Sequence, residues 1–199
     1  MSQLSYDKTI SKTVAGDKIH YGVICGNEKI IFIKVGAGGN IRGYQDKYLK
    51  MAHRIHDRLG AMVICASNPD ADYDAQVDTD KAMIVKVAED CGHADYEVYL
   101  VGTSDGGYQN LLLAQQVPQA RKLLGINVSF NTIADLIIQL QTLPHVKKLL
   151  VYGTEDDDFS CVSNLQAADC ENLEIITVDG ANHEFSGMVD NFIALIDLL

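Results

Sequence analysis

The stretch that decides the fold is EVYLVGTSDGG, residues 97–107. Its first seven residues form an apolar run typical of a buried strand, and a helical pattern follows over about 106–116. Between the two, residues 102–106 read GTSDG and match the pattern Gly-x-Ser-x-Gly. At so sharp a junction a Cβ atom two residues before or after the serine would clash, so glycine is required at both places. The pattern predicts a strained turn at which the Ser104 side chain projects from the sheet.

Strand and helix patterns alternate along the rest of the chain, after a predicted β-hairpin over residues 5–25. Further strands are expected at 29–35, 61–67, 122–130, 147–153 and 173–179. Helices are expected at 44–59, 79–91, 131–142, near 160–169 and at the C-terminus. Apolar strands separated by helices indicate an α/β fold, with a mostly parallel sheet flanked by helices. No linker-like segment interrupts the pattern, so residues 1–199 are expected to form a single domain.

Composition excludes several classes of protein. The chain has 16 Lys and Arg against 27 Asp and Glu, a net charge of −11, which disfavours binding to nucleic acids and to anionic membranes. There is no run of 18 apolar residues and no apolar leader at the start, so neither a membrane span nor a signal peptide is predicted. Five widely spaced cysteines without a Cys-x-x-Cys pair indicate free thiols and a cytoplasmic location.

A serine hydroxyl is a weak nucleophile without a base, so Ser104 needs a histidine partner. His183 lies in GANHEF, residues 180–185, directly after the last expected strand. Because parallel strands end at one edge of a sheet, His183 and Ser104 are expected on the same face. The remaining histidines fit solvated or structural roles: His20, His53, His56, His93 and His145.

Such a histidine needs a carboxylate that fixes its tautomer and stabilises the imidazolium. The segment TEDDD, residues 154–158, follows the strand expected at 147–153 and so ends at the same edge. From position alone any of its acids can serve: Glu155, Asp156, Asp157 or Asp158. The chain order serine, acid, histidine is the order that accompanies this serine motif.

Acyl chemistry at a serine also needs donors for the oxyanion of the tetrahedral intermediate. One is the backbone N–H of Asp105, the residue after the serine, and another is expected from the loop GAGGN at 36–40. This loop lacks the spacing of nucleotide-binding glycine motifs. The Cys, His and acidic residues also lack metal-ligand spacing, so no cofactor and no metal are expected.

Four motifs together resemble the α/β-hydrolase superfamily over about residues 5–199. They are VGAGGN (35–40), GTSDGG (102–107), YGTEDDDF (152–159) and GANHEF (180–185). The resemblance implies the α/β-hydrolase fold. The family often inserts a lid after the strand expected at 122–130, but here a helix follows at once, so no lid domain is expected.

The resemblance also assigns site residues. In the family the acid commonly lies three residues after a glycine that ends its strand, and Gly153 then selects Asp156. The triad implied is Ser104, Asp156 and His183. The second oxyanion donor implied is the N–H of Ala37, although Val35 stands where the family often has a histidine.

The activity that the resemblance implies is that of a serine hydrolase. Such an enzyme cleaves a carboxylic ester or a related acyl compound through an acyl-enzyme that water resolves. Two alternatives stay open: a non-catalytic binding protein of the same fold, and an acyltransferase that uses the same triad. Oligomeric state and substrate identity are left open.

Charged side chains bear on the substrate. Acids are expected in the loops on the face of the site: Asp70, Asp72, Asp74, Glu155, Asp157, Asp158, Asp179 and Glu184. Lys34 and Arg42, near the glycine-rich turn, oppose them in part. The helix expected at 44–59 turns its basic side chains away: Lys47, Lys50, Arg54 and Arg58. Since like charges repel within a Debye length of about 8 Å, the small-molecule substrate is expected to be neutral or cationic.

Overall fold

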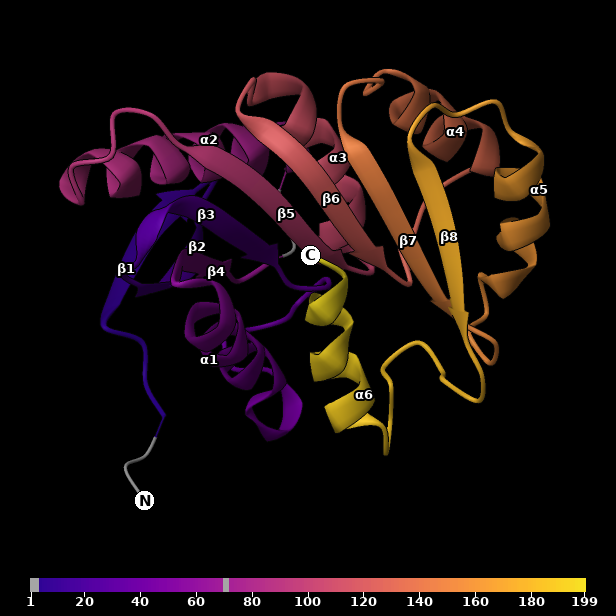
Figure 1. The fold of residues 1–199 in the computed structure, drawn as a ribbon, viewed down its shortest axis with the longest axis horizontal. Helices are drawn as coiled ribbons and strands as arrows, with labels where there is room; N and C mark the ends of the chain where they lie inside the picture. The colour runs from indigo at the N-terminus through magenta and orange to yellow at the C-terminus, as the bar shows by residue number, and fades with distance from the viewer. Residues whose placement is uncertain (1–3, 70–71) are drawn as a thin grey trace.

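In a computed structural model that describes residues 4–69 and 72–199, an eight-stranded sheet is covered by helices on both faces (Figure 1). The strands are β1 Lys8–Val14, β2 Asp17–Ile24, β3 Asn27–Lys34, β4 Ala61–Ala66, β5 Glu97–Thr103, β6 Ala120–Ile126, β7 Lys147–Gly153 and β8 Leu173–Val178. Their order in the sheet is β1-β2-β4-β3-β5-β6-β7-β8. The pairs β1–β2 and β2–β4 are antiparallel and the others parallel, so the predicted hairpin and mostly parallel sheet are confirmed.

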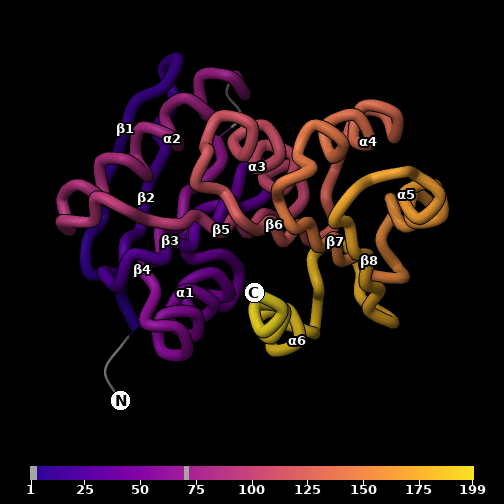
Figure 2. Tube along the Cα trace, turned by 45° about the horizontal axis from the view of Figure 1, so that its top comes forward, coloured from indigo at the N-terminus to yellow at the C-terminus, as the bar shows by residue number. Residues whose placement is uncertain are grey.

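The helices divide between the two faces of the sheet (Figure 2). They are α1 Lys47–Leu59, α2 Tyr73–Asp90, α3 Asp105–Gln116, α4 Ile133–Gln141, α5 Val162–Ala167 and α6 Val189–Ala194. Helices α1 and α6 bury one apolar cluster against the sheet, and α2 to α5 bury the other. Within residues 4–69 and 72–199, no helix is both long and apolar enough to cross a membrane. All five cysteines are unpaired.

Two boundaries differ most from the sequence-based expectation. Helix α2 begins at Tyr73, although its first turns were expected to belong to an acidic loop. The cause is Asp72, whose side chain accepts the N–H of Ala75 at 2.9 Å and so caps the helix. Strand β6 ends at Ile126, because Asn127 takes a positive φ of 44° that turns the chain out of the sheet.

The connection after β6 bears on access to the site. Residues 127–132 alone separate β6 from α4, which leaves no length of chain for a lid at this place. As expected from the sequence, the described residues therefore hold no lid domain between β6 and α4. No inserted domain therefore covers the carboxyl ends of the parallel strands from this connection.

A buried ion pair joins β3 to α2 beside the site. Lys34 Nζ lies 2.9 Å from Asp80, and both side chains are almost fully buried. The Tyr21 hydroxyl donates to the other oxygen of Asp80 at 2.6 Å. Burial raises the pKa of Asp80, whereas the Lys34 charge and the bond from Tyr21 oppose that rise. The charge of Lys34 is thus neutralised by Asp80. Lys34 therefore does not offset the negative charge of the acidic loops, contrary to the expectation from the sequence.

Replacing Lys34 with methionine is expected to destabilise the fold by about 3–5 kcal/mol, because it leaves the Asp80 carboxylate buried without a counter-charge. The double variant Lys34→Met/Asp80→Asn removes both charges and keeps a partner for Tyr21, so much of the loss should be recovered. Urea unfolding of the two variants measures the difference. A Lys34→Met protein as stable as the wild type would show that the pair contributes nothing.

Candidate active site

The turn at Ser104 is strained in the way its glycines predict. Ser104 lies between β5 and α3 with φ 53° and ψ −128°, a backbone conformation that residues other than glycine rarely adopt. A Cβ at position 102 would lie 2.4 Å from the Cα of Gly107, and a Cβ at position 106 would lie 2.3 Å from the carbonyl oxygen of Val35. Glycine is therefore required before and after the serine by the close approach of neighbouring backbone.

The structure brings Ser104, His183 and Asp156 together. His183 Nε2 lies 2.9 Å from Ser104 Oγ, and His183 Nδ1 lies 2.6 Å from Asp156 Oδ2. These residues come from three loops that leave the carboxyl ends of β5, β7 and β8, as the strand order requires. One line of hydrogen bonds thus runs from a buried carboxylate through an imidazole to a hydroxyl.

Among the four acids left open by position, Asp156 is the one that faces His183. Its side chain is fully buried, and its second oxygen accepts the backbone N–H of Asp158 at 2.7 Å. Asp157 is exposed to solvent. Partial burial raises the pKa of Asp158, and the nearby charge of Asp156 raises it further. The offset from Gly153 therefore selects the residue that the geometry places against the imidazole.

The glycine-rich loop lies against the serine. A Cβ on Gly36 would approach the Cβ of Ser104 to 3.2 Å, and Ala37 lines the same pocket as Ser104 and His183. Among the residues that the structure describes, no backbone acceptor takes the N–H of Ala37 or of Asp105. Ala37 and Asp105, whose N–H groups are the expected oxyanion donors, therefore both lie beside Ser104.

Asn68, which no sequence motif marks, connects the glycine-rich loop that holds Ala37 to Asp105. Its backbone N–H donates to the Gly39 carbonyl at 3.1 Å, and its carbonyl accepts the N–H of Gly38 at 2.7 Å. Its side-chain amide donates to the Val35 carbonyl at 3.1 Å and to the Asp105 carboxylate at 2.8 Å. One buried residue therefore holds the glycine-rich loop and the start of α3 in register.

Asn127 holds the loop of Asp156 and the loop of His183 together in a similar way. Its side-chain amide donates to the carbonyls of Asn182 and His183 at 3.1 and 3.0 Å, while its oxygen accepts the N–H of Gly153 at 2.8 Å. The carbonyl of Gly153 in turn accepts the N–H of Asp156. Asn127 directly follows β6, and Asn68 follows β4 with only Ser67 between them; a position just after the carboxyl end of a buried strand is the signal by which both could have been found.

A small pocket of about 100 Å³ opens at the serine. Besides Ser104 and His183, its walls include Ala37, Lys47, Tyr48, Ile126, Glu184 and Phe192. A second hollow of about 110 Å³ adjoins Ser129, whose Oγ lies 3.1 Å from Ser104 Oγ. The Ser104 hydroxyl therefore has a confined space for a short chain next to it.

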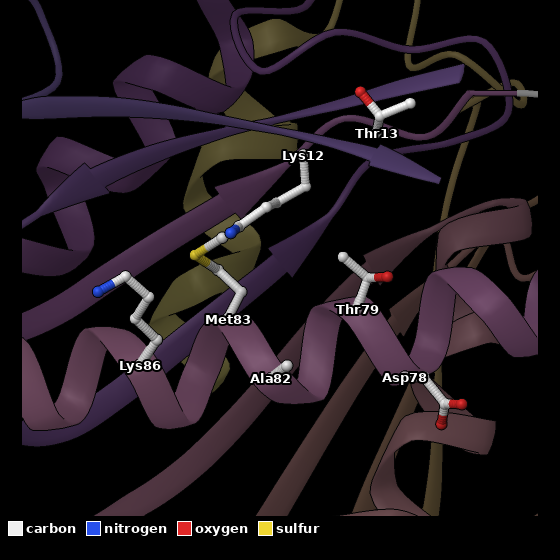
Figure 3. Close-up of a pocket in the computed structure, with 7 residues that line it drawn as sticks. All are labelled: Lys12, Thr13, Asp78, Thr79, Ala82, Met83 and Lys86. Carbon is white, nitrogen blue, oxygen red and sulfur yellow. The ribbon is translucent and has the colours of Figure 1, made fainter. Parts of the chain in front are cut away.

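A larger hollow of about 390 Å³ lies elsewhere, between β1 and α2 (Figure 3). Its lining is Lys12, Thr13, Asp78, Thr79, Ala82, Met83 and Lys86, with no serine, cysteine or histidine. Strand β1 stands four places from β5 in the sheet, so this hollow is remote from Ser104. In the described part of the chain, no group of three or more His, Cys, Asp or Glu side chains is arranged to hold a metal ion.

Comparisons with known proteins come from structure, since no protein-family model and no curated protein matches the sequence. A serine hydrolase homologue from Coxiella burnetii is 17% identical over the full length of both chains, with a TM-score of 0.74. Est1E from Butyrivibrio proteoclasticus is 13% identical over 96% of each chain, with a TM-score of 0.72. A dienelactone hydrolase from Anabaena variabilis is 16% identical over 98% of this chain and 97% of its own, with a TM-score of 0.67. At such identities the likeness concerns the fold alone.

Proposed function

The chain has the α/β-hydrolase fold, and we propose that it is a serine hydrolase that cleaves a carboxylic ester or a related acyl compound. The observation that carries the proposal is the line of hydrogen bonds through Ser104, His183 and Asp156. An imidazole within hydrogen-bond reach of a strained serine can take its proton, and a buried carboxylate on the other ring nitrogen holds the needed tautomer. The structural neighbours include a serine hydrolase homologue and a dienelactone hydrolase, which agrees with this chemistry.

In the proposed reaction Ser104 Oγ attacks the acyl carbon while His183 Nε2 takes the hydroxyl proton. Asp156 stabilises the imidazolium through Nδ1, and the N–H groups of Ala37 and Asp105 donate to the oxyanion. His183 then delivers the proton to the leaving group as the tetrahedral intermediate collapses to an acyl-enzyme. Water, deprotonated by the same imidazole, releases the acid and restores the serine.

Covalent labelling tests the proposal. A fluorophosphonate probe should label Ser104, and peptide mass spectrometry should find Ser129 unlabelled, since the Ser104 hydroxyl bonds to His183 and that of Ser129 to Ser104. In a panel of esters, hydrolysis should be fastest for short acyl chains, which match a pocket of about 100 Å³.

The two alternatives give different outcomes in the same experiment. Neither label nor hydrolysis of any ester would favour the non-catalytic binding protein. A labelled Ser104 whose esters are consumed only when an alcohol, thiol or amine acceptor is present would favour the acyltransferase. The open site favours water as the acceptor, because no lid excludes it.

Asn68→Ala is expected to lower kcat on a short ester about tenfold to a hundredfold while KM changes little. The reason is that an oxyanion donor displaced by about 1 Å weakens binding of the transition state more than binding of the substrate. Steady-state kinetics on the same ester measure the split between kcat and KM. A lower Tm with an unchanged kcat would reduce Asn68 to a structural role.

Asn110→Leu is the matched control for this variant. Asn110 is a buried asparagine in α3 whose side-chain amide has no hydrogen-bond partner among the described residues. Leucine of similar size should therefore leave kcat unchanged and stability equal or higher. Reduced kcat in both variants would mean that any change in this layer of the core disturbs the site.

A further inference from the structure

Lys47 lies inside the site, where its sequence pattern did not place it. The basic residues of α1 were expected to turn outward, and Lys50 does so, but Lys47 is only 6% exposed. It is the first residue of α1, and Phe192 of α6 packs over its ammonium group. Packing of α6 against α1 is a tertiary contact that the helical pattern of residues 44–59 does not contain.

The ammonium of Lys47 has poor partners for a buried charge. Its Nζ lies 4.6 Å from the ring centroid of Phe192 and 5.3 Å from that of Tyr48. Its oxygen contacts come from Glu184 alone in the described residues, the carbonyl at 3.4 Å and the carboxylate at 3.6 Å. The three N–H donors of the Lys47 ammonium thus have two acceptor oxygens, at 3.4 and 3.6 Å, although a buried charge normally needs close partners. Burial lowers the pKa of Lys47, and Glu184 opposes that change.

Every group around this ammonium also lines the pocket at the serine. Tyr48, Phe192 and Glu184 share that pocket with Ser104 and His183. The positive charge therefore faces the space that a substrate occupies. The side chain of Glu184 is 73% exposed, so an incoming anion can displace its carboxylate into water at little cost.

The acids expected to repel an anion are placed less favourably for doing so. Glu155, Asp157 and Asp179 are exposed, where water and salt screen them. Of the acids named for this effect that the structure describes, Glu184 alone lines the pocket; Asp70 lies outside the described residues. Within the pocket the low-dielectric walls of Tyr48 and Phe192 screen the Lys47 charge far less.

We propose that Lys47 makes this site select short acyl compounds that carry a carboxylate, such as half-esters of small dicarboxylic acids. This inference rests on the proposed serine hydrolase activity. The substrate carboxylate replaces that of Glu184 and accepts a charge-assisted hydrogen bond from Nζ over the Phe192 ring. The pocket of about 100 Å³ restricts the chain between carboxylate and scissile carbonyl to a few carbons.

The test compares kcat/KM for esters of similar size and different charge. Monomethyl succinate carries the carboxylate on the acyl side, acetoxyacetate carries it on the alcohol side, methyl pentanoate is neutral, and methyl 4-aminobutanoate is cationic. At least one carboxylate ester should exceed the neutral ester about tenfold, the size of one charge-assisted hydrogen bond. A preference for the neutral or cationic ester, which the acidic loops predict, would overturn the proposal.

Variants separate the effect of the Lys47 charge from the effect of the other charges on the molecule. Lys47→Met keeps the apolar stem and should bring the ratio of carboxylate to neutral ester to about one or below. Lys50→Met makes the same charge change on the exposed side of α1 and should leave the ratio as in the wild type. Glu184→Gln removes the competing carboxylate and should raise the ratio. A preference that survives in Lys47→Met would assign it to another group.

A binding measurement keeps this inference separate from the proposed activity. Succinate should bind the Ser104→Ala protein, as followed by calorimetry, and should bind about tenfold more weakly when Lys47→Met is added. This readout needs no turnover. Esters hydrolysed without a carboxylate preference would overturn the inference alone. Absence of hydrolysis and labelling, with succinate still bound through Lys47, would overturn the hydrolase and leave the anion site.

Discussion

Replacing Ser104 with alanine is expected to lower kcat on a short p-nitrophenyl ester about 10⁴-fold or more, because no other described hydroxyl contacts His183 Nε2. Residual turnover should come from the N–H donors at Ala37 and Asp105, which the change leaves in place. Stability should be almost unaffected. Alanine carries the same Cβ as serine at the positive φ of 53°, so the backbone strain is equal in the two proteins.

Steady-state kinetics and thermal unfolding of the same preparations check this result. Ser129→Ala is the control, since its hydroxyl lies 3.1 Å from Ser104 Oγ and the structure gives it no contact with His183. It should retain most of the activity. Wild-type rates in Ser104→Ala would show that the esterase reaction proceeds elsewhere on the molecule and would remove Ser104 from the mechanism.

The parts of the site that the sequence predicted are those with local causes. The turn at Ser104 requires glycine on both sides, because neighbouring backbone lies within 2.4 Å of the place that a Cβ would take. This requirement is visible in the sequence as two glycines within five residues. The loops that hold Asp156 and His183 follow from a simple rule, since each loop leaves the carboxyl end of a parallel strand, although position alone left four acids open in the first of them. Strand and helix order was predictable for the same reason, because apolar periodicity is a local property.

The parts that the sequence did not predict depend on distant contacts. Asn68 donates hydrogen bonds to Val35 and Asp105, which lie far from it in the chain. The apolar pattern of the sequence does not reveal such contacts between polar groups. Lys47 is buried because Phe192, far along the chain, packs over it. The start of α2 is a local exception, because the Asp72 side chain caps the helix at Ala75, and a run of acidic residues indicates a loop as well as a cap. For Asn68 and Lys47, the side chain has partners that only the folded arrangement supplies.

The second large effect is expected from Asp156→Asn, which should lower kcat/KM about 10⁴-fold, as an amide does at this place in a triad. The reason lies in the two partners of the carboxylate. One oxygen accepts the N–H of Asp158 at 2.7 Å, and the other faces His183 Nδ1 at 2.6 Å. An asparagine whose oxygen keeps the bond to Asp158 must turn its NH₂ toward Nδ1. The imidazole then carries its proton on Nε2 and cannot accept that of Ser104.

Asp157→Asn and Asp158→Asn are the matched controls, because each makes the same chemical change one or two residues further along. Asp157 is exposed, and Asp158 touches the triad acid through its backbone N–H, which the substitution keeps. Both variants should therefore lose less than about tenfold, the effect of a nearby solvent-screened charge. Rates on one short ester at one fixed pH compare the three proteins. A loss at Asp157 equal to or larger than that at Asp156 would move the acid by one residue and show that the offset from Gly153 misassigns it.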